Sequence, residues 1–253
     1  MFGLIYAVVS YLAFLGSFTY FALFTDGLAV PRTVDGGFLT TPVTATLIDV
    51  ALISLFGLQH SIMARASWKA VLTRVLPPAL ERATYVLAAS AALVLLLWQW
   101  RPLPAPVWSI GNPAAVVGLW VVNALGWLGV PVASLMIDHF DLFGLKQAFA
   151  GFRRVSLQRR GFVTPLFYRY IRHPIMTSLL VGLWVTPHMS AGHLLLSVGM
   201  SVYILIGVHF EERALIRELG EPYVRYQAEV PRFFPDVTRT SVNDRRGAIG
   251  ARR

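Results

Sequence analysis

Two clusters of polar residues flank the last hydrophobic stretch of the chain and could bind a charged small molecule. The first is Arg172-His173-Pro174, preceded by Tyr170. Pro174 suits the first turn of a helix, whose free N–H groups can bind an anion. Arg172 could add a bidentate grip on a carboxylate. An alternative is that Arg172 is an ordinary basic anchor beside interfacial tyrosines.

The second cluster is His209-Phe210-Glu211-Glu212-Arg213, where the last hydrophobic helix leaves the apolar stretch. Packing does not demand two adjacent glutamates at such a place. We expect one to face water and the other to accept hydrogen bonds from ribose hydroxyls or an ammonium group. The helix should stop at Gly220, and Tyr223 follows it.

The composition indicates which elements must position these residues. Hydrophobic residues make up 56% of the 253 and charged residues only 14%, against about 45–50% and about 25% in soluble domains. The charges lie between long uncharged stretches, which is typical of a membrane protein. The absence of cysteine excludes disulfides, iron–sulfur clusters, zinc–thiolate sites and a cysteine nucleophile, and we predict no metal site.

The uncharged stretches predict an all-α, polytopic membrane helical bundle. A membrane-crossing helix needs about 20 apolar residues. Four spans meet this length: Phe2–Phe24, Thr44–Met63, Ala83–Trp100 and one of about 24 residues opened by Pro113. The first has no cleavage site and is predicted to be retained.

A short helical hairpin is predicted to follow these four spans. Pro174–Phe210 is an uncharged run of 37 residues, too long for one span and slightly too short for two. Thr186-Pro187-His188 and Gly192 mark the break, so a short helix over Ile175–Thr186 should pair with a longer one over His193–Leu219. The total is five to six membrane helices. Irregular backbone at membrane depth must line a cavity or be buried in protein.

The basic residues set the predicted orientation. Twenty of the 22 Lys and Arg residues fall in 65–82, 138–173 and the segment from Glu212 onward, which the positive-inside rule places in the cytoplasm. Both termini, including the C-terminal segment, should then be cytoplasmic. The net charge of +9 reflects this orientation and does not indicate a nucleic-acid partner. We predict one domain over 1–239 and a basic disordered tail over 240–253, and leave the oligomeric state open.

Both polar clusters carry a resemblance to known enzymes. Four features resemble the S-adenosylmethionine-binding signature of membrane methyltransferases: Arg172-His173-Pro174, the short hairpin, Glu211-Glu212 and Gly220-x-x-Tyr223-x-x-Tyr226. These enzymes include isoprenylcysteine carboxyl and phospholipid N-methyltransferases. The match covers about 164–235. Met176 and Ser178 replace the tyrosine and glycine of the commoner pattern Arg-His-Pro-x-Tyr-x-Gly.

A narrower resemblance, to the bacterial methanethiol S-methyltransferases, extends over nearly all of the chain. Its segments are 56–65 (FGLQHSIMAR), 81–87 (ERATYVL), 138–147 (DHFDLFGLKQ) and 186–189 (TPHM). Membership would imply transfer of a methyl group from S-adenosylmethionine to methanethiol, a small volatile thiol, releasing dimethyl sulfide. It would also imply a bacterial inner (cytoplasmic) membrane location.

The resemblance implies a cofactor site among helices, since no Gly-x-Gly-x-x-Gly follows a strand. Methyl transfer from a sulfonium to a thiolate removes charge, so a dry, aromatic-rich pocket should favour it. The residues assigned to the cofactor are Tyr170, Arg172, His173, Pro174, Glu211, Glu212, Arg213 and Tyr223.

The thiol that accepts the methyl group must first lose its proton, which requires a base or a nearby cation. Even a cysteine thiol has a pKa of about 8.5, and an apolar pocket raises that pKa. We assign His60, His139 and Asp141 as catalytic, with Gln59, Tyr85 and Asp138 binding the substrate. Polar residues inside a span usually face the bundle interior. A histidine near a helix end is also often purely structural. His188 and His193 should lie at the opposite end of the hairpin.

Two other functions fit the same residues. A phospholipid N-methyltransferase, or another small-molecule methyltransferase of the superfamily, would use the same cofactor site. A non-catalytic membrane protein could instead bind haem or a metal through paired histidines.

Overall fold

The long helices of the structure, a computed structural model, form a multi-pass membrane bundle. The structure describes residues 1–157 and 163–235, so the predicted tail 240–253 and residues 158–162 lie outside the described residues. Five helices there are long and apolar enough to cross a bilayer: α1 (Phe2–Thr25), α2 (Pro42–Ala64), α4 (Glu81–Gln99), α5 (Pro113–Ile137) and α9 (Ala191–Leu219). With the short α8 (Pro174–Trp184), they confirm the predicted all-α architecture, and their ends agree with prediction within two residues.

The helices begin where the sequence supplies a cap or a proline. Three of the membrane helices start with a side chain that accepts a hydrogen bond from the backbone N–H three residues later, and three have proline in the first turn. The capping residues are Thr41, Asn112 and Ser190, and the prolines are Pro42, Pro113 and Pro174. Gly220 ends α9 with a φ of 65°, in the left-handed region that glycine tolerates.

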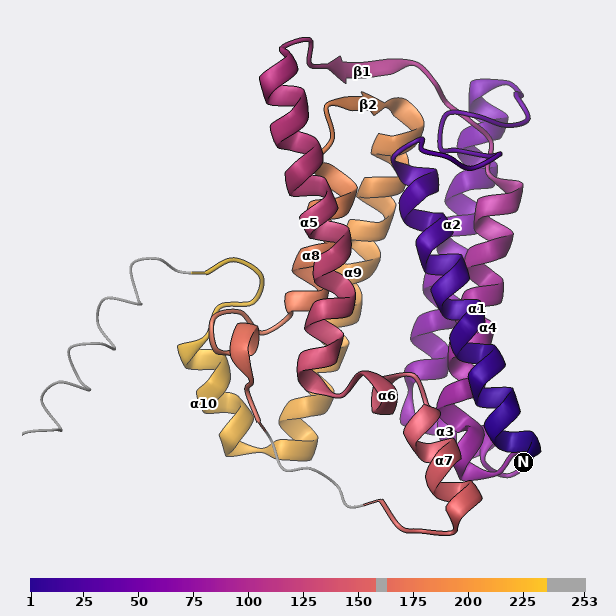
Figure 1. Ribbon diagram of the computed structural model, residues 1–253, viewed down its shortest axis with the longest axis vertical. Coiled ribbons are helices and arrows are strands. Elements are labelled where there is room, and N and C mark those ends of the chain that lie inside the picture. Colours follow the sequence, from indigo (N-terminus) through magenta and orange to yellow (C-terminus); the bar gives the residue numbers. More distant parts are fainter. Residues whose placement is uncertain (158–162, 236–253) are drawn as a thin grey trace, which may run out of the picture.

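Most short elements gather at the end of the bundle that carries the basic segments. Figure 1 shows α3 (Ala66–Leu72), α6 (His139–Leu142), α7 (Leu145–Arg153) and α10 (Glu221–Glu229) at the end where the N-terminus lies. Two 3₁₀ turns, η1 (Pro78–Leu80) and η2 (Leu166–Arg169), precede α4 and α8. The segments grouped by their basic residues in the sequence therefore share one end of the molecule.

A small antiparallel sheet at the opposite end was not predicted. β1 (Pro106–Ser109) pairs with β2 (His188–Ser190), with Pro106 opposite Ser190 and Ser109 opposite His188. Strands of four and three residues are too short to show a period-two pattern in the sequence. The sheet joins the loop before α5 to the break between α8 and α9, and it places His188 far from the basic end, as predicted (Figure 1).

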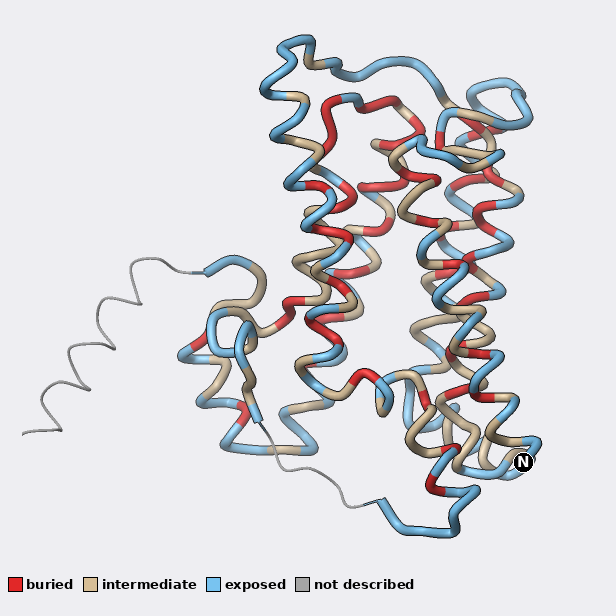
Figure 2. Tube along the Cα trace, viewed as in Figure 1, coloured by how far each residue is buried: buried red, intermediate tan, exposed pale blue. Residues whose placement is uncertain are grey.

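Glycines let α5 and α8 approach closely. A Cβ added at Gly126 would lie 2.6 Å from the backbone nitrogen of Gly182, and one at Gly129 would lie 2.5 Å from Oγ of Ser178. Small residues at such crossings are common in membrane bundles. The ring of Trp127 lies against Gly182 and belongs to the main core cluster. Figure 2 shows buried positions alternating with exposed ones along the long helices, so each turns one face to its neighbours.

Asp26, which follows α1, joins this helix to α5. It accepts hydrogen bonds from Nε1 of Trp127 at 3.0 Å and from Nδ2 of Asn123 at 3.1 Å. Burial raises the pKa of Asp26 to about 6, although these two donors oppose the shift. The same Nδ2 of Asn123 donates to the carbonyl of Gly182 at 2.9 Å, so α1, α5 and α8 meet at one polar point.

We predict that Gly126→Ala destabilises the protein by about 1–3 kcal/mol, because the new methyl group has no space beside Gly182. The measurement is the thermal unfolding of the purified protein in detergent. Gly118→Ala is the matched control on the same helix, since a Cβ there has no heavy atom within 4 Å among the described residues. Equal unfolding temperatures for the two variants would contradict the close approach of α5 and α8.

Candidate active site

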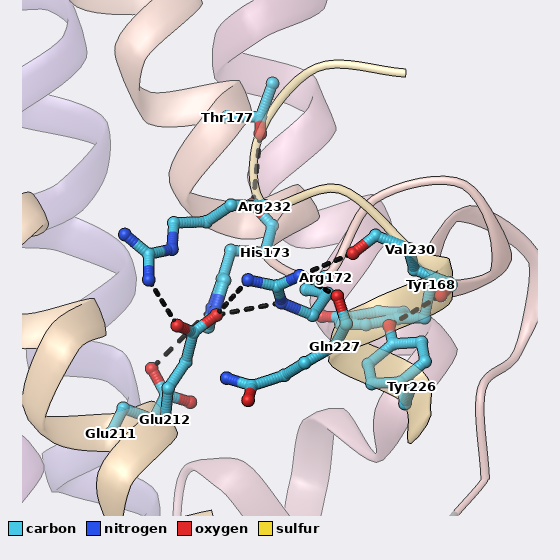
Figure 3. A network of polar contacts seen from close by, with 10 residues as sticks. All are labelled: Tyr168, Arg172, His173, Thr177, Glu211, Glu212, Tyr226, Gln227, Val230 and Arg232. Atoms are coloured by element: carbon cyan, nitrogen blue, oxygen red, sulfur yellow. Dashed lines mark hydrogen bonds and ion pairs between the residues drawn. The ribbon is translucent and has the colours of Figure 1, made fainter. Parts of the chain in front are cut away.

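Glu212 is the centre of a buried ion-pair network at the basic end of the bundle (Figure 3). Its side chain is only 5% exposed. Oε1 accepts from Nε of Arg172 at 2.8 Å and lies 3.0 Å from Nε2 of His173. Oε2 accepts from Arg232, which reaches it from the segment after α10. A carboxylate so far from water needs this number of charged and polar partners.

Arg172 is held on several sides and is not a lipid-facing anchor. Its guanidinium also donates to the carbonyl oxygens of Gln227 and Val230, at 3.0 and 2.5 Å. Its backbone N–H donates to the carbonyl of Pro231 at 2.9 Å, and that of His173 donates to Arg232 at 3.1 Å. These bonds fold the segment after α10 back onto the start of α8, as Figure 3 shows.

Glu211 differs from its neighbour because half of its side chain is exposed. One of its carboxylate oxygens lies 3.8 Å from Nδ1 of His173. Its carboxylate lies within electrostatic range of three tyrosines, Tyr203 of α9, Tyr85 of α4 and Tyr168 of η2. Burial, together with this charge, raises the pKa of Tyr168. Glu211 therefore connects the ion-pair network with a group of tyrosines.

His60 lies within that group of tyrosines and has unused hydrogen-bonding capacity. Its ring centroid is 4.8 Å from that of Tyr85 and 5.7 Å from that of Tyr203. Nδ1 of His60 and Oε1 of Gln59 are buried and have no hydrogen-bond partner in the described part of the chain. A Cβ at Gly57 would lie 3.1 Å from the Tyr203 ring, so this glycine leaves space for the tyrosine. Unpaired buried polar atoms of this kind require a ligand, a water or an ion.

His139 lies in a separate cluster between α1 and α5. Its Nε2 is 2.7 Å from the hydroxyl of Tyr11, and its Nδ1 is 2.7 Å from Oγ of Ser134. Phe140 and Phe143 pack against its ring. Burial lowers the pKa of His139, so the imidazole is neutral near pH 7.

The two aspartates beside His139 pair with basic residues. Asp141 accepts from Arg82 of α4 at 3.1 Å and from Gln147 at 3.1 Å. Asp138 caps α6 and forms an ion pair with Lys146. His139 and Asp141 were both assigned as catalytic from the sequence, and the structure gives His139 two other partners, Tyr11 and Ser134. Asp138 therefore links the start of α6 to α7, and Asp141 links α6 to both α4 and α7.

The remaining residues predicted to bind the cofactor lie around the Glu212 network and differ in how far their side chains are exposed to solvent. Pro174 is buried in the first turn of α8, and Tyr223 of α10 is 2% exposed. Burial raises the pKa of Tyr223, and that of the adjacent Tyr226 to about 12. Tyr170 is 55% exposed, and Arg213 is exposed on α9.

Four residues of these clusters were missed in the sequence: Tyr11, Tyr168, Tyr203 and Arg232. Tyr11 and Tyr203 lie within uncharged spans, where a tyrosine resembles any large core residue. Arg232 was one of nine Arg residues after Glu212. Its position in the stiff Val230-Pro231-Arg232 stretch was the available signal.

Comparison with known proteins gives relatives over nearly the whole chain. Methanethiol S-methyltransferase from Mycobacterium tuberculosis is 45% identical, covering 92% of this chain and 95% of its own. Methanethiol S-methyltransferase 2 from Bradyrhizobium diazoefficiens is 46% identical, covering 99% and 97%. Nurim from Danio rerio is 32% identical over 64% of this chain and 62% of its own. No protein-family model and no solved structure matches.

The helical bundle and these relatives define the protein as a multi-pass membrane enzyme of the methyltransferase class. Within this class, the chain belongs to the methanethiol S-methyltransferase family, as its similarity had suggested. A methyltransferase requires a methyl donor, and the clusters around Glu211 and His60 contain the unpaired and exposed polar groups that could bind one.

We predict that Arg172→Ala lowers stability by about 3–5 kcal/mol, because it leaves the buried Glu212 without its main cationic partner. Thermal unfolding in detergent measures the effect. Arg225→Ala is the matched control, since Arg225 pairs with Glu221 at the surface, where the two side chains are 73% and 68% exposed. Surface pairs contribute at most about 1 kcal/mol. Equal small effects from both substitutions would contradict a structural role for the Arg172–Glu212 pair.

Proposed function

We propose that this protein transfers the methyl group of S-adenosylmethionine to methanethiol and releases dimethyl sulfide. The observation that carries the proposal is the 39–46% identity to several methanethiol S-methyltransferases over at least 91% of this chain. The matched region includes both the Glu211–Glu212 cluster and the helices that carry His60 and His139.

The residues around Glu211 fit the charged parts of S-adenosylmethionine. The half-exposed carboxylate of Glu211 suits an ammonium group or ribose hydroxyls. Nε of Arg232 is buried without a hydrogen-bond partner among the described residues and could donate to a carboxylate. The rings of Tyr85 and Tyr203 offer faces for a sulfonium. The bound cofactor would supply an electrophilic methyl group on a positively charged sulfur.

Three of the residues assigned to the cofactor have a different proposed part. Arg172, His173 and Glu212 partner one another, so we propose that they hold the backbone around the site in place. Glu211 is then the carboxylate that meets the cofactor. Tyr170 and Arg213 are exposed near this network and remain proposed contacts, together with the buried Pro174 and Tyr223.

The acceptor thiol needs a dry pocket and a group that takes its proton. His60 and His139 are the proposed catalytic histidines, with Gln59 and Tyr85 proposed to contact the thiol. Both histidines lie among aromatic rings, and such surroundings exclude water from a reaction in which opposite charges cancel. Asp138 and Asp141 are occupied by Lys146 and Arg82, so their proposed part is to hold α6.

We propose a location in the bacterial inner membrane with both termini in the cytoplasm. The five membrane helices and the basic segments at one end support this orientation. We also propose that residues 1–239 form one domain, with the cofactor bound mainly by 164–235.

The test is incubation of the purified protein in detergent with methyl-labelled S-adenosylmethionine and either methanethiol or phospholipid. Label should appear in volatile dimethyl sulfide, and only with methanethiol. Label in the lipid extract would favour a phospholipid methyltransferase and refute the proposal. A Soret band from the purified protein, without methyl transfer, would favour a haem protein instead.

We predict that Glu211→Gln weakens the binding of S-adenosylhomocysteine by about 10–150-fold, the range expected for loss of a hydrogen bond to a charged group. Isothermal calorimetry measures the affinity. Glu221→Gln is the control, because this carboxylate is 68% exposed and pairs with Arg225 at the surface. Unchanged affinity in Glu211→Gln would remove Glu211 from the cofactor site.

A further inference from the structure

The hydrogen bonds around His139 fix which ring nitrogen carries the proton. Oγ of Ser134 donates its single hydrogen to the carbonyl of Pro131 at 2.8 Å. It must therefore accept at its other contact, the 2.7 Å bond to Nδ1 of His139. Nδ1 carries the proton, and Nε2 presents a lone pair to the hydroxyl of Tyr11 at 2.7 Å.

The hydroxyl of Tyr11 can then serve any further partner only as a hydrogen-bond acceptor. Its hydroxyl hydrogen is donated to Nε2 of His139, so its oxygen can only accept from a third group. No residue in the described parts of the chain donates to this oxygen. A partly buried hydroxyl in this position can accept a proton while it passes its own to the neutral imidazole, which then acts as the general base.

The surroundings keep this chain of hydrogen bonds uncharged. α1 and α5, which supply Tyr11 and Ser134, contain no Asp, Glu, Lys or Arg. The charged groups on the other adjoining elements are Asp138 and Asp141 at α6, Lys146 and Arg153 on α7, and Glu81 and Arg82 on α4. Asp138 pairs with Lys146, Asp141 with Arg82, and Glu81 with Lys69.

The position of these residues suits the acceptor side of the reaction. The ring of Phe143 stacks on that of Phe14 with centroids 4.1 Å apart, and Tyr11 packs against the same Phe143. This aromatic group lies between α1 and α5. α6, which carries His139, lies at the basic end, where the Glu211 cluster also lies (Figure 1). An apolar thiol would enter such a group readily, since sulfur packs well against aromatic rings.

We propose that Tyr11 is the catalytic residue that takes the proton from the acceptor thiol and passes its own proton to His139, while Ser134 positions the ring of His139. This inference rests on the proposed methanethiol methyltransferase function. The S–H bond breaks as a bond forms between the proton and Oη of Tyr11, while the tyrosine's own proton moves to Nε2 of His139. The products are a thiolate, a neutral tyrosine and an imidazolium, which later releases its proton to solvent. No other reactant is needed.

The test is the pH dependence of kcat/KM for methanethiol in Tyr11→Phe. General-base catalysis contributes about 10²–10⁴-fold, and we expect a loss of that size near pH 7. The variant depends on thiol already ionised in solution, because the thiolate is the nucleophile. Its kcat/KM should therefore rise about tenfold for each pH unit, as the ionised fraction of a thiol does below its pKa, while the wild type rises much less. Tyr11→Phe combined with His139→Gln should lose no more activity than either change alone.

Tyr6→Phe is the matched control. Tyr6 lies on the same helix and donates an interhelical hydrogen bond to Oγ1 of Thr84 at 3.1 Å, so it reports the cost of losing such a bond. Wild-type kcat/KM in Tyr11→Phe would overturn the inference, as would an equal, pH-independent loss in both variants. Absence of methanethiol methylation in the wild type would instead refute the proposed function, which keeps the two failures distinguishable.

Discussion

The arrangement of the basic end depends on one buried carboxylate. Glu212 binds Arg172 and His173 from the start of α8 and Arg232 from the segment after α10. An unpaired carboxylate at this depth would cost several kcal/mol, so the three partners must be present together. This requirement brings segments separated by 20–40 residues to one place. It also leaves the adjacent Glu211 half exposed, with its charge available to a ligand.

The short length of α8 allows the segments that carry Arg172, Glu212 and Arg232 to come together. This helix ends at Trp184, and the sheet of β1 and β2 closes the break that follows. Gly126 and Gly182 allow α8 to lie directly against α5, which holds the helix at a fixed height in the bundle. The start of α8 therefore lies beside Glu212, which is located before the last two turns of α9. A full-length span in place of α8 would move Arg172 away from this carboxylate by the length of the added turns.

Local patterns in the sequence were sufficient for the helices and insufficient for their contacts. Runs of about 20 uncharged residues indicate spans directly, because the thickness of the bilayer sets their length. Arg172, His173 and Glu212 could be selected because charges are conspicuous beside apolar segments. Tyr11 could not, since its partner His139 is 128 residues away and no periodicity relates the two. The same applies to Asp141, whose pairing with Arg82 depends on how α4 packs beside α6.

The charge distribution matches the requirements of the proposed methyl transfer from S-adenosylmethionine to a thiol. A donor sulfonium is a cation, so the Glu211 side of the proposed site should be anionic, and its carboxylate is the exposed group of the pair. The acceptor thiol arrives neutral and becomes an anion only when its proton leaves. A permanent positive charge beside it would hold the thiolate by attraction and oppose the loss of its charge during transfer. A neutral Tyr11–His139 pair avoids this, because the positive charge on His139 exists only while the proton is there. Burial lowers the pKa of His139, and thereby favours return of that proton to water and restoration of the neutral base.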